Sequence, residues 1–171
     1  MSAREPGAGH VPAPDITWLT ARTTDIVLAA IDGDGRRAAD AMDAVATRYA
    51  DRGMYSLYCG LAEAIVRMAG YREADATGGP GQPDAGQWWG LRVESAVTGR
   101  PVAPEDLSPD VADMVGAARW VTAYLNGDAD QLNALFHVTA ADPERAALLP
   151  VGLVRMVGLH GRARLGRDGD R

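Results

Sequence analysis

Apolar residues recur at three- and four-residue steps between residues 15 and 70, which is the spacing of amphipathic helices. We predict three helices there, ending at Gly33, Gly53 and Gly70, because glycine readily adopts the left-handed backbone that closes a helix. Their apolar stripes are Leu19, Ile26, Val27, Ala30 and Ile31, then Ala38, Met42, Val45 and Tyr49, and finally Leu57, Leu61, Ile65 and Met68. Residues 15–70 are therefore expected to form a first helical unit.

The same spacing returns in residues 108–161, which predicts a second helical unit packed on the first. Ser108 and Pro109 suit the cap and the first turn of its first helix. Pro150 falls inside the last helical segment of this unit. Its missing amide hydrogen predicts a kink or a break there.

The segments outside these two units have a different character. Residues 1–14 and 162–171 are expected to be a flexible leader and a flexible, arginine-containing tail. Residues 71–86 are rich in glycine and proline and predict a linker. In the following residues, up to 107, Trp89, Leu91 and Val93 alternate with other residues, so a short strand or hairpin is expected and a short helix is the competing interpretation.

Two stretches of the chain match each other. "LAAIDGDGRRAADAM" (28–42) and "TAYLNGDADQLNALF" (122–136) align Gly33–Asp34 with Gly127–Asp128, and "VRMAG" (66–70) is echoed by "VRMVG" (154–158). In each glycine–aspartate pair, the glycine can end one helix and the aspartate can cap the next. The pattern predicts a mainly α protein made of two tandem three-helix units, with internal duplication as a hypothesis for their origin.

A calcium site is the main alternative interpretation of the first glycine–aspartate pair. A calcium loop needs oxygen ligands at its first, third, fifth and twelfth positions and glycine at its sixth. With Gly35 as the sixth residue, the first and twelfth are Ala30 and Ala41, whose side chains offer no oxygen. A phosphate-binding loop is also disfavoured, because no Gly-Lys-Ser/Thr sequence follows. The corner between two helices remains the preferred interpretation.

The glycine–aspartate corner also resembles the inner turn of a tetratricopeptide repeat. The residues that fit are Gly33, Asp34 and Ala38 in the first copy and Gly127, Asp128 and Phe136 in the second. Ile26 and Trp120 stand where that repeat has a small residue. The resemblance therefore implies a shared helical-hairpin geometry and not membership of the family.

Composition narrows the classes of function. The 171 residues carry a net charge of −6, which argues against nucleic acid and anionic membranes as partners. All 17 basic residues are arginine, a bias typical of GC-rich bacterial genomes. A single cysteine, the lack of a signal peptide at the start, and the lack of an apolar run of about 18 residues together favour a cytoplasmic protein.

The sequence shows no constellation typical of catalysis, metal binding or cofactor binding. Its three histidines are His10, His137 and His160, and no two of them have the spacing of a helical metal site. Cys59 lies in an apolar stretch and is expected to act as a small hydrophobic residue. Glu63 is followed one turn later by Arg67, so an exposed ion pair is expected. The missing catalytic motif favours a non-enzymatic protein over an enzyme without deciding between them, and no cofactor is expected.

The preferred functional hypothesis is an interaction or regulatory module that binds a protein partner, or a second copy of itself, in a groove between helices. Aromatic residues supply most binding hot spots, and the expected anchors are Trp88, Trp89 and Tyr58. The alternative hypothesis is a small-molecule-binding protein or enzyme with a pocket between the two helical units. The polar residues expected in that pocket are Glu63, Tyr124 and His137.

Overall fold

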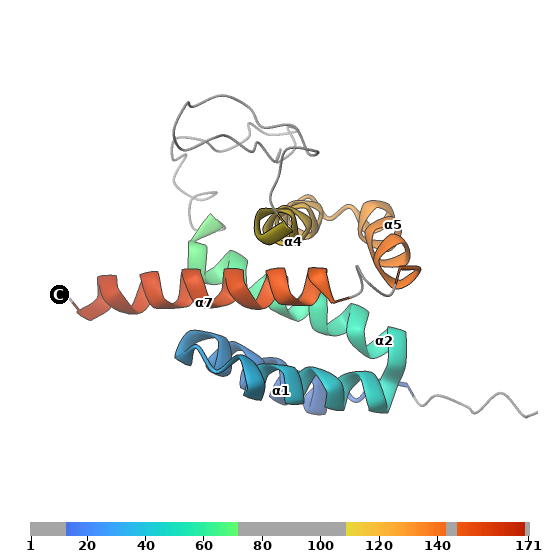
Figure 1. Cartoon of the computed structure of the whole chain (residues 1–171), viewed down its shortest axis with the longest axis horizontal. Helices are drawn as coiled ribbons and strands as arrows, with labels where there is room; N and C mark the ends of the chain where they lie inside the picture. The colour runs from blue at the N-terminus through green and yellow to red at the C-terminus, as the bar shows by residue number, and fades with distance from the viewer. Residues whose placement is uncertain (1–12, 72–108, 143–146, 170–171) are drawn as a thin grey trace, which may run out of the picture.

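The described part of the chain is mainly α-helical, as the sequence predicts. A computed structural model describes residues 13–71, 109–142 and 147–169, and within these ranges the backbone forms helices and no strand (Figure 1). The helices are α1 (Ile16–Asp32), α2 (Gly35–Ala69), α4 (Pro109–Leu125), α5 (Ala129–Ala140) and α7 (Leu148–Gly169). The predicted leader, linker and strand or hairpin, with Trp88 and Trp89, lie outside the described residues apart from their edges.

The corner between α1 and α2 forms as predicted. Gly33 has a φ of 77°, in the left-handed region, and ends α1. The amide of Asp34 donates to the Ala29 carbonyl at 2.8 Å, which returns the chain over the last turn of α1. The Asp34 carboxylate then accepts a hydrogen bond from the amide of Arg37 at 3.0 Å and caps α2.

The corner between α4 and α5 repeats these hydrogen bonds. Gly127 has a φ of 64°, and the amide of Asp128 donates to the Ala123 carbonyl at 3.0 Å. The Asp128 carboxylate accepts from the amide of Gln131 at 2.9 Å and caps α5. In both pairs the glycine therefore ends one helix and the aspartate caps the next, as the sequence predicts.

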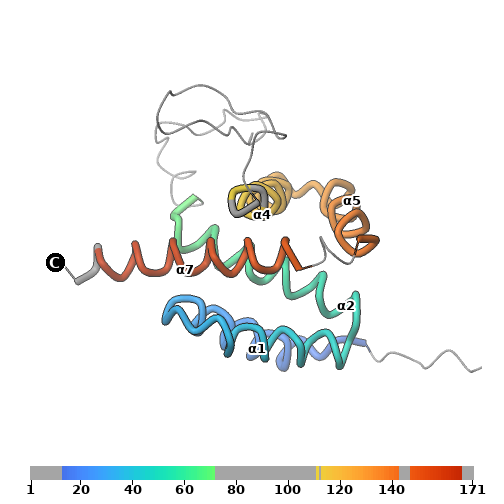
Figure 2. The backbone as a smooth tube through the Cα atoms, in the orientation of Figure 1, coloured from blue at the N-terminus to red at the C-terminus, as the bar shows by residue number. Residues whose placement is uncertain are grey.

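Helix α2 contains a sharp reversal at Ala50, where φ is 47° and ψ is −140°. Residues 35–49, the first arm, run along α1, and residues 51–69, the second arm, turn back (Figure 2). The predicted end at Gly53 is therefore wrong by three residues. Gly53 is instead a buried packing position, because a Cβ there would lie 2.5 Å from the Cβ of Tyr49.

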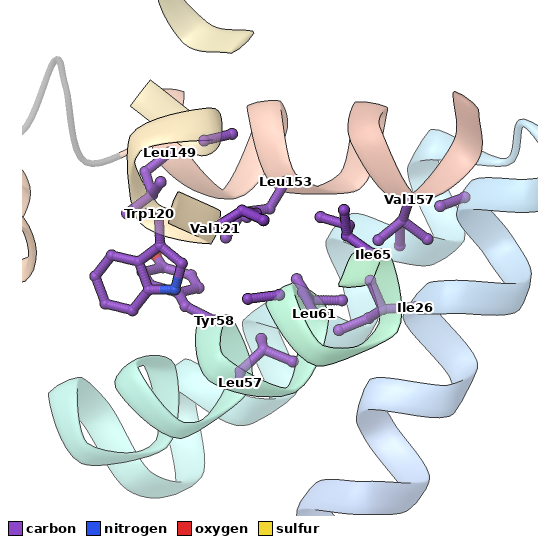
Figure 3. Close-up of a cluster of buried hydrophobic side chains, with 14 of the residues drawn as sticks. Ile26, Leu57, Tyr58, Leu61, Ile65, Trp120, Val121, Leu149, Leu153 and Val157 are labelled. Atoms are coloured by element: carbon purple, nitrogen blue, oxygen red, sulfur yellow. The ribbon is translucent and has the colours of Figure 1, made fainter. Parts of the chain in front are cut away.

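Helix α7 joins the two halves of the protein, since it packs against α1, α2 and α4. Figure 3 shows Val157 of α7 beside Ile26 and Ile65, and Leu149 of α7 near Trp120. These side chains are buried and belong to a single hydrophobic cluster. The described helices therefore share one continuous core, with no separate core for each predicted unit.

The start of α7 corrects the expectation for Pro150. Because α7 begins at Leu148, Pro150 lies in its first turn, where a backbone amide needs no partner within the helix. Proline is tolerated at that position, so Pro150 does not interrupt the helix. The sequence-based prediction placed Pro150 inside a helical segment, whereas the structure places it in the first turn of α7.

The end of α7 also differs from the prediction, because residues 162–169 are helical and not a flexible tail. The Nη1 atom of Arg162 donates to the Ala30 carbonyl at 3.0 Å, near the end of α1. The Nη1 atom of Arg164 donates to the Arg67 carbonyl at 2.9 Å, near the end of α2. These two arginines cap the carbonyl ends of two helices, where positive charge is favourable.

Candidate functional site

A groove of about 540 Å³ runs between α1 and the second arm of α2. From α1 it is lined by Ile16, Leu19, Thr20, Thr23, Thr24, Val27 and Leu28. From α2 it is lined by Ser56, Gly60, Glu63, Ala64 and Arg67. We call this surface the α1–α2 groove.

The floor of the groove is set by close contact of its two helices. A Cβ at Gly60 would lie 3.1 Å from the Cγ2 atom of Thr23, so the missing side chain lets the helices approach here. Leu19 is buried at the groove, whereas the other buried residues of α1, Ile26, Ala29 and Ala30, do not line it and pack in the core. Helix α1 therefore has two largely apolar faces, and only one of them is covered by the described residues.

Three of the hydroxyl groups in the walls of the groove are already paired within their own helices. The hydroxyls of Thr23, Thr24 and Ser56 each donate to the carbonyl four residues earlier, at 2.9, 2.9 and 3.0 Å. Ile16 and Leu28 are 70% and 47% exposed. An apolar ligand could cover this surface without leaving these hydroxyls unpaired.

One end of the groove is polar and well organised. Arg67 Nε donates to Glu63 Oε1 at 2.6 Å, and the Tyr124 hydroxyl donates to Glu63 Oε2 at 3.1 Å. The predicted pair of Glu63 and Arg67 is thus confirmed, and Tyr124 extends it to α4. The Arg67 side chain is 75% exposed, and within the described part of the chain its terminal nitrogens make no further hydrogen bond or ion pair.

The structure places Tyr58 in the core, whereas the sequence suggested a surface anchor. Its ring is 5% exposed and contacts Trp120 edge-on, with ring centroids 5.6 Å apart. Burial, with a smaller contribution from Asp51, raises the pKa of Tyr58 to about 12. Tyr58 therefore offers little ring surface to a partner, and Trp88 and Trp89 lie outside the described residues.

The structure brings together two of the three residues expected in the alternative pocket. Glu63 and Tyr124 share the hydrogen bond described above, which links α2 to α4. His137 is exposed on α5, where its ring lies beside that of Phe136. His137 lines neither the α1–α2 groove nor a second, smaller hollow among α4, α5 and α7.

Cys59 is partly buried and packs against the hydrophobic core, which agrees with its expected role as a hydrophobic residue. Burial raises the pKa of its thiol to about 11. A nucleophilic cysteine requires the opposite shift, because the reactive species is the thiolate. Cys59 is therefore not activated for catalysis at neutral pH.

A second hollow, of about 380 Å³, lies among α4, α5 and α7. Its lining includes Val138, which is 62% exposed, and Asp113. The Oδ1 atom of Asp113 is buried and has no hydrogen-bond partner in the described ranges. An apolar ligand placed here would cover the rest of a carboxylate that already has one buried oxygen without a partner, which is costly. The α1–α2 groove lacks this penalty.

Metal-binding clusters and membrane-spanning helices are both absent from the described residues. These residues contain no group of three or more histidine, cysteine or acidic side chains able to hold a metal ion. None of their helices combines the length and the apolar character needed to cross a membrane. Comparisons with protein-family models, curated proteins and solved structures returned no match for this chain.

Sequence analysis missed the groove because it followed a single apolar stripe along α1. A second series, Ile16, Thr20, Thr23 and Val27, has steps of four, three and four residues. It was overlooked because threonine counts as polar, yet a threonine that bonds its own helix presents its methyl group. A search for helix faces that treats threonine as apolar would have found the series.

Proposed function

We propose that this protein is a non-enzymatic interaction module that binds one amphipathic helix of a partner protein in the α1–α2 groove. The observation that carries the proposal is an exposed, largely apolar groove in which the hydroxyls of Thr23, Thr24 and Ser56 and the Glu63 carboxylate already have hydrogen-bond partners. Large exposed apolar surfaces are typical of protein-binding sites. The anchoring contacts within the described residues would come from Ile16 and Leu28. A contribution from Trp88 and Trp89 stays a prediction, because both lie outside the described residues.

The length of the groove suits a short helix. From Ile16 to Leu28, α1 rises about 18 Å, which equals a little more than three turns. Figure 2 shows that α1 and the second arm of α2, the two helical segments that line the groove, run in the same general direction. A partner helix with apolar residues at steps of three and four would pack into the seam between them, as in a helical bundle. We expect its apolar stripe to span about 12 residues.

The charges near the groove indicate an acidic partner. Arg67 stands at one end and presents its terminal nitrogens to solvent. Arg52 is exposed one turn before Ser56 on the same helix, near the other end. An arginine fork binds a carboxylate through two parallel hydrogen bonds. The partner helix is therefore expected to carry aspartate or glutamate beside the ends of its apolar stripe.

A small-molecule site is the second candidate, and the hydrogen bond between Glu63 and Tyr124 supports it. That bond holds a polar group of α4 against one end of an apolar groove, which is the composition of many ligand sites. An elongated apolar molecule with one polar end would match this arrangement. Such a ligand would be retained by the purified protein and detected by native mass spectrometry.

The docking proposal is tested by selecting helical peptides from a randomised display library on the purified protein. We expect amphipathic helices to be enriched and their binding to weaken at least tenfold in Leu28→Glu, which puts a charge into the groove. Leu165→Glu is the matched control, because Leu165 is 60% exposed on α7, outside the groove.

If no helix is enriched, or if both variants bind equally well, the docking proposal is wrong. If helices bind but carry no excess of acidic residues, the proposal of helix binding in the groove is kept and the proposed acidic character of the partner is wrong. Arg67→Gln distinguishes the charge contribution directly, because it removes the guanidinium and keeps most of the side-chain length.

We also propose that the α1–α2 and α4–α5 hairpins derive from one ancestral unit. The support is the recurrence of the same corner hydrogen bonds at Gly33–Asp34 and Gly127–Asp128, together with the matching sequences around them. Detecting the same two-fold pattern in related sequences would test this origin independently of function.

A further inference from the structure

The reversal in α2 rests on one residue in a strained conformation. Ala50 has a φ of 47° and a ψ of −140°, a region of backbone space that glycine adopts readily and alanine rarely adopts. The residues on both sides are helical, so a single residue links two antiparallel arms. A strained, very short hinge of this kind is a recognised cause of domain exchange between copies of a protein.

The sequence across the hinge favours a straight helix. Residues 46–55, "ATRYADRGMY", contain no proline, and Gly53 is the residue among them with the lowest helix propensity. If Ala50 adopted helical angles, the 35 residues of α2 would form one helix about 52 Å long. The local preference of the chain and the folded-back structure therefore oppose each other at Ala50.

We propose that α2 opens at Ala50, so that two copies of the chain exchange α1 with the first arm of α2 and form a domain-swapped dimer. In the open chain, contacts within the exchanged part, such as the ring contact of Trp18 with Tyr49, stay unchanged. Contacts between the exchanged part and the rest are made with the second copy. These include the packing of Ile26 near Ile65 and Val157, seen in Figure 3, and the hydrogen bond of Arg162 to the Ala30 carbonyl.

The exchange retains the native core while it releases the strain at two hinges. The monomer and the dimer bury the same side chains, so their balance depends on the hinge conformation and on protein concentration. The α1–α2 groove would also persist in the dimer, with α1 from one copy and the second arm of α2 from the other. The exchange and the docking proposal are thus tested separately.

Two substitutions at the hinge should shift this balance in opposite directions. Ala50→Gly removes the strain of the folded-back form and weakens the straight helix, so it should favour the monomer. Gly53→Ala strengthens the straight helix, and its Cβ would lie 2.5 Å from the Cβ of Tyr49 in the folded-back form, so it should favour the dimer.

The experiment refolds each protein at high concentration and measures its mass by size-exclusion chromatography with light scattering. We expect a slowly dissociating dimer for the unmodified chain, at least a tenfold lower dimer-to-monomer ratio for Ala50→Gly, and at least a tenfold higher ratio for Gly53→Ala. Equal ratios in the three proteins, or a folded and strictly monomeric Gly53→Ala, would overturn the proposal.

A distance measurement covers the case in which Gly53→Ala does not fold. Spin labels at Asp40 and Arg67, in a Cys59→Ser background, lie on the two arms of α2. In an opened chain they are about 40 Å apart along one helix, a separation that the folded-back arms do not produce. The dimer of the labelled chain, which keeps Ala50 and Gly53, should show this long distance when it is diluted with unlabelled chain. A dimer that shows only the distance found in the monomer, or the absence of any dimer, contradicts the exchange.

Discussion

The two glycine–aspartate corners have the same hydrogen bonds, but the glycines of the two VRM-x-Gly sequences do not behave alike. Gly70 has a φ of 76° and ends α2. Gly158 continues as part of α7, and a Cβ there would lie 2.7 Å from the Ala30 carbonyl oxygen. The corner depends on local bonds and repeats wherever its residues repeat. The roles of Gly70 and Gly158 depend on what packs against each of them, so the same short sequence adopts two different structures.

The two hairpins also differ in what they bury. Ile26 and Trp120 occupy corresponding places before the two corners, and both are fully buried. Trp120 contacts the rings of Tyr55, Tyr58 and Phe136 and thus fills an aromatic cluster. The first hairpin has no such cluster at Ile26 and leaves its outer face open as the α1–α2 groove. The predictions below test these differences, beginning with the largest effect.

Trp120→Ala should lower the free energy of unfolding by about 3–5 kcal/mol, because it removes a fully buried aromatic side chain. Ile26→Val, at the matching place in the first hairpin, should cost only about 0.5–1.5 kcal/mol. Chemical denaturation followed by circular dichroism measures both. Similar losses in Trp120→Ala and Ile26→Val would show that the aromatic cluster does not stabilise the second hairpin as described.

Gly158→Ala should destabilise the fold by about 1–3 kcal/mol, since the new methyl group is forced against the Ala30 carbonyl. Gly70→Ala should cost about 1–2 kcal/mol for a different reason, the left-handed backbone at that position. Asparagine separates the two causes, because it tolerates left-handed angles but is larger than alanine. Gly70→Asn should be milder than Gly70→Ala, and Gly158→Asn should be worse than Gly158→Ala. The reverse order at either site would contradict its assigned role.

Asp34→Ala and Asp128→Ala should each reduce stability by about 1 kcal/mol, because each removes a side chain that caps a helix. The two losses should be nearly equal, since the corners have the same hydrogen bonds. Asp34→Asn and Asp128→Asn should restore most of the stability, because asparagine caps helices as well as aspartate does. If calcium addition raised the melting temperature only in proteins that retain Asp34, a metal site would replace the capping role.

Alkaline pH should weaken the core at Cys59 and Tyr58. Burial raises the pKa of Cys59 to about 11 and that of Tyr58 to about 12, both above their ordinary values of 9.0 and 10.0. A group with a raised pKa in the folded state stabilises the fold fully below its unfolded pKa, and that contribution is lost as pH rises through the folded pKa. Stability should therefore fall between about pH 9 and 12. Cys59→Ser should lessen the fall at its lower end, and alkylation of the folded protein at pH 8 should be slow.

Local interactions explain which parts of the fold the sequence could predict. Gly33, Asp34, Gly127 and Asp128 act on residues within five positions of themselves, so their roles are legible in a short stretch of sequence. The reversal at Ala50 was not predictable in this way, because alanine carries no turn signal and Gly53 nearby carries a strong one.

Long-range contacts explain the features that were missed. Arg162 and Arg164 cap helices more than ninety residues away in the chain. No short stretch of sequence shows such contacts, so the arginine-containing end of the chain was predicted to be a flexible tail. In the groove, the pair of Glu63 and Arg67 was predicted because its members are one turn apart, whereas the hydrogen bond from Tyr124 spans two helices. The apolar lining was missed because it contains threonines.

The most direct test of the docking account is to map where a selected helix binds. Backbone amide chemical shifts of the isotope-labelled protein would be recorded by NMR with and without the peptide. The account predicts that the large shifts fall on α1 from Ile16 to Leu28 and on α2 from Ser56 to Arg67. Shifts concentrated around Asp113 and Val138, in the hollow among α4, α5 and α7, would contradict it.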